Sequence, residues 1–289
     1  MKKFTKSRFL FFIIASILFL IPISSFGYKL ERNTAFTKNK FLQLKPNGES
    51  IGELEDEIRP NIDLKGGSVQ EEKELLSAFY LLGFSTYEII YNYRWYPLGK
   101  KIDDATVKDT IISTLKNLRD LMAQVEAEDN LLELISGIIN RIEKESIKST
   151  KQDPKTDALL NELSYRIREH IINTFGLTYG VYYSFGIWTS KVMAYSELVV
   201  VVDGFAEKDL NKKKKQEIVT SLTEELKELL KSSETFKSQT EDLTVKAVSR
   251  NLDSLQEIAA EIKSTVDAKT AKRLYDYSLN IYYGIVPGN

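Results

Sequence analysis

Apolar side chains recur every three or four residues along most of this chain beyond residue 68, which is the period of an α-helix. The clearest stripe has spacings of 4, 4, 3, 4 and 4 and consists of Leu76, Tyr80, Phe84, Tyr87, Tyr91 and Trp95. Similar stripes lie within residues 107–125, 131–142, 159–171 and 218–229. The one β-prone run, residues 198–202, continues a helical stretch. The sequence therefore predicts an all-α fold.

Local signals divide these stripes into helices. Ser68 and Glu71 form a capping box at the first helix start, and Pro97 ends that helix. A second helix is expected from Asp103 or Asp104, with a kink or turn near Asp129. Aspartate followed by proline at 153–154 predicts the next start. That helical pattern continues to about residue 204, and we expect its glycines at 176, 180 and 186 to permit close helix contacts or to mark a bend.

The C-terminal third is more charged. Residues 245–266 carry apolar side chains at alternating spacings of 3 and 4, which is a heptad seam, and a last helix is expected over residues 268–283. We expect the seam to pair with residues 218–229 as an antiparallel hairpin; pairing with a second copy of the chain is the alternative. The expected fold is an elongated bundle of about six long helices with this heptad-patterned hairpin and a loosely ordered N-terminal arm.

The N-terminus reads as an export signal. Lys2, Lys3, Lys6 and Arg8 precede an apolar run over residues 9–23, and small residues precede a cleavage site after Gly27. The predicted division is a signal peptide at 1–27, an arm at 28–67 and a helical domain at 68–289. Within that domain, 68–204 is rich in aromatic residues and 205–289 is charged. The mature protein is expected in the periplasm or outside the cell.

Composition argues against several functions. Forty basic and forty-one acidic residues leave a net charge near zero, which gives no general attraction to nucleic acid. The chain has no cysteine, so it has no disulfide, thiol chemistry or lipidated cysteine. The single histidine, His170, lacks the companions that catalysis or zinc binding requires. We therefore predict a non-enzymatic protein with no cofactor and no metal site; a hydrolase that uses only carboxylates is the weaker alternative.

Residues 171–190 form an uncharged stretch of twenty residues, long enough to span a membrane. Several hydroxyl and amide side chains dilute its hydrophobicity, and Lys191 and Glu197 follow on the same predicted helix. A buried helix of a soluble bundle is therefore preferred to a membrane span.

Fifteen tyrosines, gathered mainly in three clusters, supply the candidate functional residues. Tyrosine is enriched at protein interfaces because its ring is apolar and its hydroxyl is polar. The candidate docking residues are Tyr87, Tyr91, Tyr93, Trp95, Tyr96, Tyr182, Tyr183, Trp188, Tyr282 and Tyr283. Tyr93 and Tyr96 lie off the main stripe and are the expected exposed members. The alternative is that all these rings fill the core.

The export signal, the helical pattern and the tyrosine-rich tracts at 91–96 and 179–188 together resemble the periplasmic flagellar coiling proteins of leptospiral spirochaetes. The resemblance implies a helical coat protein of the flagellar filament, with filament or envelope proteins as partners. It rests on class and size rather than on a diagnostic motif, so it assigns no residue.

A faint internal echo is also present. Gly83 precedes Trp95 by twelve residues, and Gly176 precedes Trp188 by twelve, as an internal duplication would leave them.

In function, the sequence favours an exported structural or interaction protein that docks partner proteins through aromatic helix faces. The alternative is a periplasmic protein that binds a small molecule in a tyrosine-lined pocket. Oligomeric state, partner and ligand are left open.

Overall fold

The computed structural model describes residues 67–95, 104–124, 127–145, 153–204, 212–240 and 246–286. The predicted signal peptide and nearly all of the predicted arm lie outside these residues. The described residues form nine helices and no strand, which confirms the all-α class. The helices are α4 (Gly67–Trp95), α5 (Asp104–Gln124), α6 (Asp129–Lys144), α7 (Pro154–Phe175), α8 (Leu177–Asp203), α9 (Lys212–Lys231), α10 (Ser233–Thr240), α11 (Lys246–Glu261) and α12 (Ala268–Ile285).

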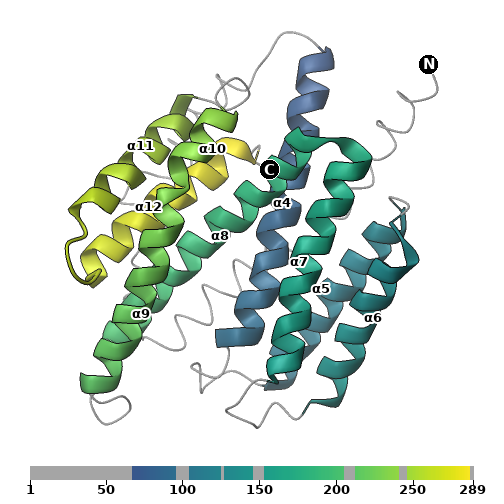
Figure 1. The fold of residues 1–289 in the computed structure, drawn as a ribbon, viewed down its shortest axis with the longest axis horizontal. Helices are drawn as coiled ribbons and strands as arrows, with labels where there is room; N and C mark the ends of the chain where they lie inside the picture. The colour runs from purple at the N-terminus through teal and green to yellow at the C-terminus, as the bar shows by residue number, and fades with distance from the viewer. Residues whose placement is uncertain are drawn as a thin grey trace.

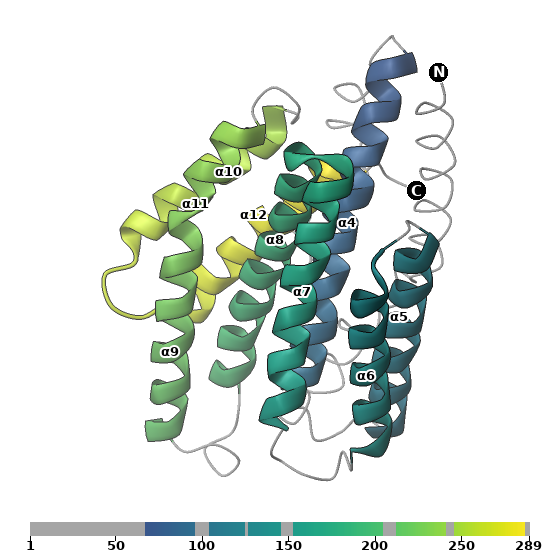
Figure 2. The same cartoon turned by 45° about the vertical axis from the view of Figure 1, so that its right-hand side comes forward.

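The two longest helices, α4 and α8, form the most extensive helix–helix contact of the fold. Helices α5 and α6 lie on one side of this pair and α9 to α12 on the other, with α7 beside α4 (Figure 1 and Figure 2). Both central helices carry apolar side chains around most of their circumference, as expected for helices surrounded by protein. The core therefore follows α4 and α8 through the middle of the molecule.

Among the described helices, only α8 is long and apolar enough to cross a membrane. Its most apolar window is 83% buried inside the chain, as is usual for the central helix of a folded bundle. Glu197, near its C-terminal end, is also buried.

The helix α7–α8 boundary differs from the prediction of one long helix. The chain breaks at Gly176, which has a φ of 111°, in a region that only glycine adopts readily. Its backbone N–H donates to the carbonyls of Ile171 and Ile172 and so closes α7. Gly176 is thus the bend that the glycine pattern suggested, and α7 and α8 form a hairpin around it.

The expected heptad hairpin is not confirmed. Helix α11 packs chiefly against α12 and less against α9, while α9 packs chiefly against α8. Helix α11 also ends at Glu261, before the expected seam does. Its buried side chains are Val248, Leu252, Leu255 and Ile258, so the stripe turns toward Ile258 instead of continuing through Ala259. Val245 lies outside the described residues.

Candidate functional site

Most of the ten candidate docking residues lie in the core. Six side chains are buried: Tyr87, Tyr91, Tyr93, Tyr182, Tyr183 and Trp188. Tyr282 and Tyr283, near the end of α12, are only partly buried. Trp95 belongs to α4, but its side chain, like the whole of Tyr96, falls outside the described residues. Core packing, the alternative weighed from the sequence, therefore accounts for the six buried side chains.

Several of the buried aromatic residues direct their polar atoms at internal partners. The indole N–H of Trp188 donates to the Leu229 carbonyl at 2.7 Å and thereby joins α8 to α9. The Tyr183 hydroxyl donates to the Ser164 carbonyl at 3.2 Å and joins α8 to α7. Both bonds satisfy polar atoms that burial would otherwise penalise, and both fix one helix relative to its neighbour.

Tyr93 was the expected exposed tyrosine, and it is only 8% exposed. Its hydroxyl donates to a carboxylate oxygen of Glu145 at 2.9 Å and accepts from the backbone N–H of Asp153 at 3.2 Å. The helical spacing does not reveal this burial, because the end of α6 and the start of α7 cover Tyr93 from the side of α4. Tyr93 is therefore part of a polar junction between three helices.

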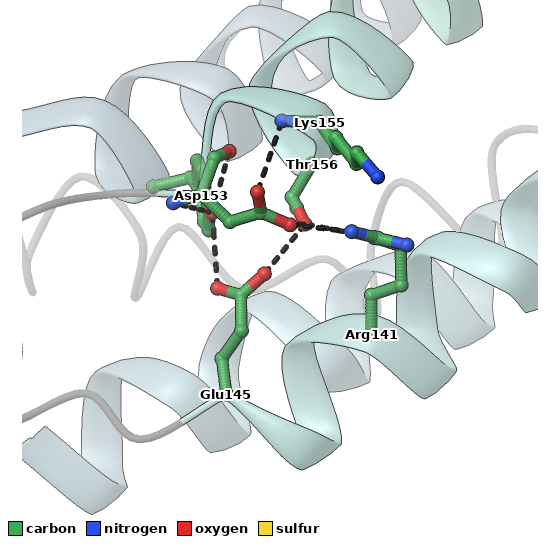
Figure 3. Close-up of polar contacts among 6 residues, drawn as sticks. Arg141, Glu145, Asp153, Lys155 and Thr156 are labelled. Atoms are coloured by element: carbon green, nitrogen blue, oxygen red, sulfur yellow. Dashed lines mark hydrogen bonds and ion pairs between the residues drawn. The ribbon is translucent and has the colours of Figure 1, made fainter.

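We define this junction as Tyr93, Arg141, Glu145, Asp153 and Thr156. Figure 3 labels Arg141, Glu145, Asp153 and Thr156, with Lys155 beside them. Thr156 lies within 2.5 Å of Glu145 Oε1 and 3.2 Å of Asp153 Oδ2. Arg141 donates to Asp153 Oδ2 at 2.5 Å and to the Thr156 hydroxyl at 3.3 Å. Each polar side chain of the junction is engaged by another member.

In the polar junction Arg141 pairs with Asp153, and Glu145 is engaged by the hydroxyls of Tyr93 and Thr156. The hydrogen bond from Arg141, helped by the Lys155 backbone N–H, holds the pKa of Asp153 below its usual range. Burial and the neighbouring Glu145 carboxylate raise the pKa of Tyr93, so its phenol stays protonated. A protonated phenol and an arginine-paired carboxylate are poor bases. This arrangement fastens α4, α6 and α7 together.

Two buried carboxylates were not singled out from the sequence. Glu88 on α4 is 6% exposed and Glu197 on α8 is 1% exposed. The Tyr91 hydroxyl donates to Glu197 Oε2 at 3.0 Å. Burial, followed by the charge of Glu197, raises the pKa of Tyr275 on α12. The signal that could have revealed this group is an isolated acidic residue within an otherwise apolar helix, since such a residue must be buried with the helix.

His170 contacts neighbouring residues of its own helix, α7. Its Nδ1 lies 3.4 Å from the Thr174 hydroxyl, and its ring meets Phe175 edge to face at 6.4 Å. Within the part of the chain that the structure describes, no three His, Cys, Asp or Glu side chains form a group that could hold a metal ion.

Within the described residues, seven aromatic side chains are at least partly exposed: Tyr165, Phe175, Tyr179, Phe236, Tyr277, Tyr282 and Tyr283. Tyr282 packs its ring 4.9 Å from Phe84 and 5.5 Å from Tyr283, and both tyrosines remain partly exposed. Tyr165 on α7 is 56% exposed, and Leu177 at the start of α8 is 65% exposed. Of the ten candidates, only the Tyr282–Tyr283 pair is therefore both described and accessible.

No family model, no curated protein and no solved structure matches this chain.

Proposed function

We propose that this chain is an exported, non-enzymatic helical protein that acts by binding other proteins. The observation that carries the proposal is the Tyr282–Tyr283 pair near the end of α12. Two adjacent tyrosines stay partly exposed there, while six of the other candidates are buried.

The position of the pair favours recognition. The ring of Tyr282 is braced by Phe84, and hydrophobic packing continues to Tyr80 at 6.3 Å. A braced ring loses little conformational entropy when a partner covers it, and tyrosine combines apolar area with a hydrogen-bonding group. These are properties of side chains that contribute strongly to protein interfaces. A coat protein of a flagellar filament, which the family resemblance implies, is one form of this function.

The binding test uses Tyr283→Ser in the full chain. Because Tyr282 supports the core through Phe84, Tyr283 is the better residue to remove. We expect crosslinking in intact cells, read by mass spectrometry, to lose the partner that the unchanged protein captures. The thermal melt should stay close to that of the unchanged protein.

Tyr165→Ser is the matched control, since it removes an exposed tyrosine from α7, on a different helix. This variant should retain the partner. The proposal fails if both variants capture the partner equally, or if Tyr283→Ser loses it only because the melt collapses.

Export has its own test. Cell fractionation should place the protein outside the cytoplasm, and the mature N-terminus determined by mass spectrometry should be Tyr28. A cytoplasmic protein that retains residues 1–27 would refute the export part of the proposal.

A further inference from the structure

The crossing of α4 and α8 is reciprocal. A Cβ atom built on Gly83 would lie 1.9 Å from the carbonyl oxygen of Tyr183, and one built on Gly186 would lie 1.9 Å from the carbonyl oxygen of Tyr80. Tyr80 precedes Gly83 by three residues, as Tyr183 precedes Gly186. The next close atoms obey the same rule, because the Gly83 position meets the Ile187 nitrogen and the Gly186 position meets the Phe84 nitrogen.

This reciprocity extends to side chains. The two helices share the pattern Tyr-x-x-Gly-x-x-Thr, at residues 80–86 and 183–189. Thr86 donates to the carbonyl four residues before it at 2.7 Å, and Thr189 does the same at 2.9 Å. Each threonine also lies beside the tyrosine of the opposite helix, where it offsets part of the rise in that tyrosine's pKa that burial causes.

The helices that close each side show a second shared pattern. Residues 153–171 and 267–285 both read Asp-x-Lys-Thr-x-x-x-Leu-x-x-x-Ser-x-x-Ile-x-x-x-Ile. Asp153 caps α7 through the Lys155 N–H, and Asp267 caps α12 through the Thr270 N–H. The shared leucine and isoleucines are buried in both helices: Leu160, Ile167 and Ile171 in α7, and Leu274, Ile281 and Ile285 in α12.

The closing helices meet the central helices at matching places. The Ser77 hydroxyl of α4 donates to the Ile285 carbonyl of α12 at 2.6 Å. At the matching position of α8, a Cβ on Gly180 would meet the Ile172 side chain of α7, one residue beyond the counterpart of Ile285. Likewise Tyr282 of α12 packs its ring 6.3 Å from Tyr80 of α4. Its counterpart Arg168 of α7 donates to Ser184 of α8, the residue after the counterpart of Tyr80.

We infer that the chain is an internal duplication. Its two halves, residues 67–175 and 177–285, pair about a pseudo-two-fold axis that passes through the Gly83–Gly186 crossing. Within the first half α4 is followed by α5, α6 and α7; within the second, α8 is followed by α9, α10 with α11, and α12.

The crossing is thus an isologous contact, as in a two-fold symmetric dimer. Gly83 meets Tyr183, and their counterparts Gly186 and Tyr80 meet in the same way. The register differs from the one suggested by the sequence alone. Gly83 corresponds to Gly186, and not to Gly176, because equivalence is set by the contact and not by the distance to a tryptophan.

A segment exchange in the full chain tests the equivalence. Residues 80–86 and 183–189 are interchanged, which leaves Tyr, Gly and Thr in place on both helices and swaps only the four intervening residues. The matched control interchanges residues 79–85 with 183–189, which displaces both glycines by one position. Both variants lose the bond from Trp188 to Leu229. We therefore expect the first variant to melt cooperatively at a lowered temperature with native helical circular dichroism, and the displaced variant to lose cooperative melting. Equal disruption of both variants would overturn the duplication.

A second measurement does not depend on the exchanged chain folding. Gly83→Ala and Gly186→Ala are compared singly and together. Because each new methyl group separates the same two backbones, the inferred geometry predicts similar loss from each. The two substitutions should therefore not be additive. The unfolding equilibrium constant of the double variant should be at least tenfold smaller than the value obtained by multiplying the two single effects. Additive effects, or single effects that differ by more than tenfold, would contradict the pseudo-two-fold crossing.

Discussion

At the scale of single residues, the fold depends on two glycines that no other residue can replace without moving backbone. At Gly83 and Gly186 the atom that a Cβ would strike is a carbonyl oxygen of the opposite helix, which cannot rotate away as a side-chain end can. Gly137 on α6 is different, because a Cβ there would have no neighbour within 4 Å. Gly83 and Gly186 are thus required by the close helix contact, whereas Gly137 only adds conformational entropy to the unfolded chain.

Gly83→Ala should therefore lower the free energy of unfolding by about 3 kcal/mol, because the methyl group forces α4 and α8 apart. Gly137→Ala, the control, should raise it by about 0.5–1 kcal/mol, since alanine restricts the unfolded chain and favours helix. Urea titration followed by circular dichroism measures both. Similar small effects from the two substitutions would show that the close approach is absent.

Asp276 on α12 gives the protein a pH dependence. Burial raises its pKa to about 6, with partial relief from Lys272. A carboxyl whose folded pKa exceeds its unfolded value of about 3.9 stabilises the fold least when it is ionised, so its contribution is lost as pH rises through 6. Asp276→Asn should raise stability at pH 7.5 by about 1 kcal/mol, after allowance for solvent screening of this partly exposed group, and should have little effect at pH 4.

Asp267 supplies the control of opposite sign. The Thr270 backbone N–H lowers the pKa of this capping carboxyl, so its ionised form stabilises the fold and that benefit is lost as pH falls. Asp267→Asn should thus lower stability at pH 7.5. The assignment of Asp276 is wrong if both substitutions shift the melt in the same direction at that pH.

At the scale of helices, the starts that carry a capping residue could be predicted, and the helix partners could not. Asp153 and Pro154 predicted the start of α7, and the aspartates at 103 and 104 predicted the start of α5, which begins at Asp104. Both could be predicted because capping residues and proline act within one turn of backbone. The partner of α11 was mistaken because the heptad pattern shows which face is apolar but not which helix covers it. The burial of Tyr93 escaped prediction for the same reason, since its cover comes from residues 145 and 153.

The hairpin between α7 and α8 makes a prediction at this scale. Ala at Gly176 would have ample room but a backbone conformation that side-chain-bearing residues rarely adopt. Gly176→Ala should cost about 1–3 kcal/mol of stability from strain alone, without the helix separation expected at Gly83. Urea denaturation should show a lower midpoint with an unchanged slope. An unperturbed midpoint would mean that α7 and α8 are joined differently.

At the scale of the whole molecule, each of the two inferred halves covers the apolar face of the other half's central helix. The surface of α4 that carries Gly83 is covered by α8 of the same chain, so a second copy is not needed to cover it. Much of the candidate aromatic surface is used in this way, and the proposed binding role falls to the small pair at the end of α12. This division between structural and accessible tyrosines depends on long-range packing and could not be derived from helical period.

Because these faces cover each other within one chain, we predict that the protein is a monomer. Light scattering on residues 28–289 should give the mass of a monomer over a hundredfold range of concentration. In the described residues α4 and α8 cover each other, so we expect neither to drive self-association. A mass that rises to that of a dimer would mean that the crossing forms between chains and not within one.

Hydrogen–deuterium exchange with mass spectrometry tests the central claim most directly, namely that the α4–α8 pair is the shared core of two equivalent halves. Amides of residues 76–93 and of their counterparts 179–196 should exchange slowest and at matching rates, opening only with global unfolding. Amides of α5, α6, α9 and α11 should exchange faster. Fast exchange in either central helix, or protection that differs strongly between them, would contradict the account.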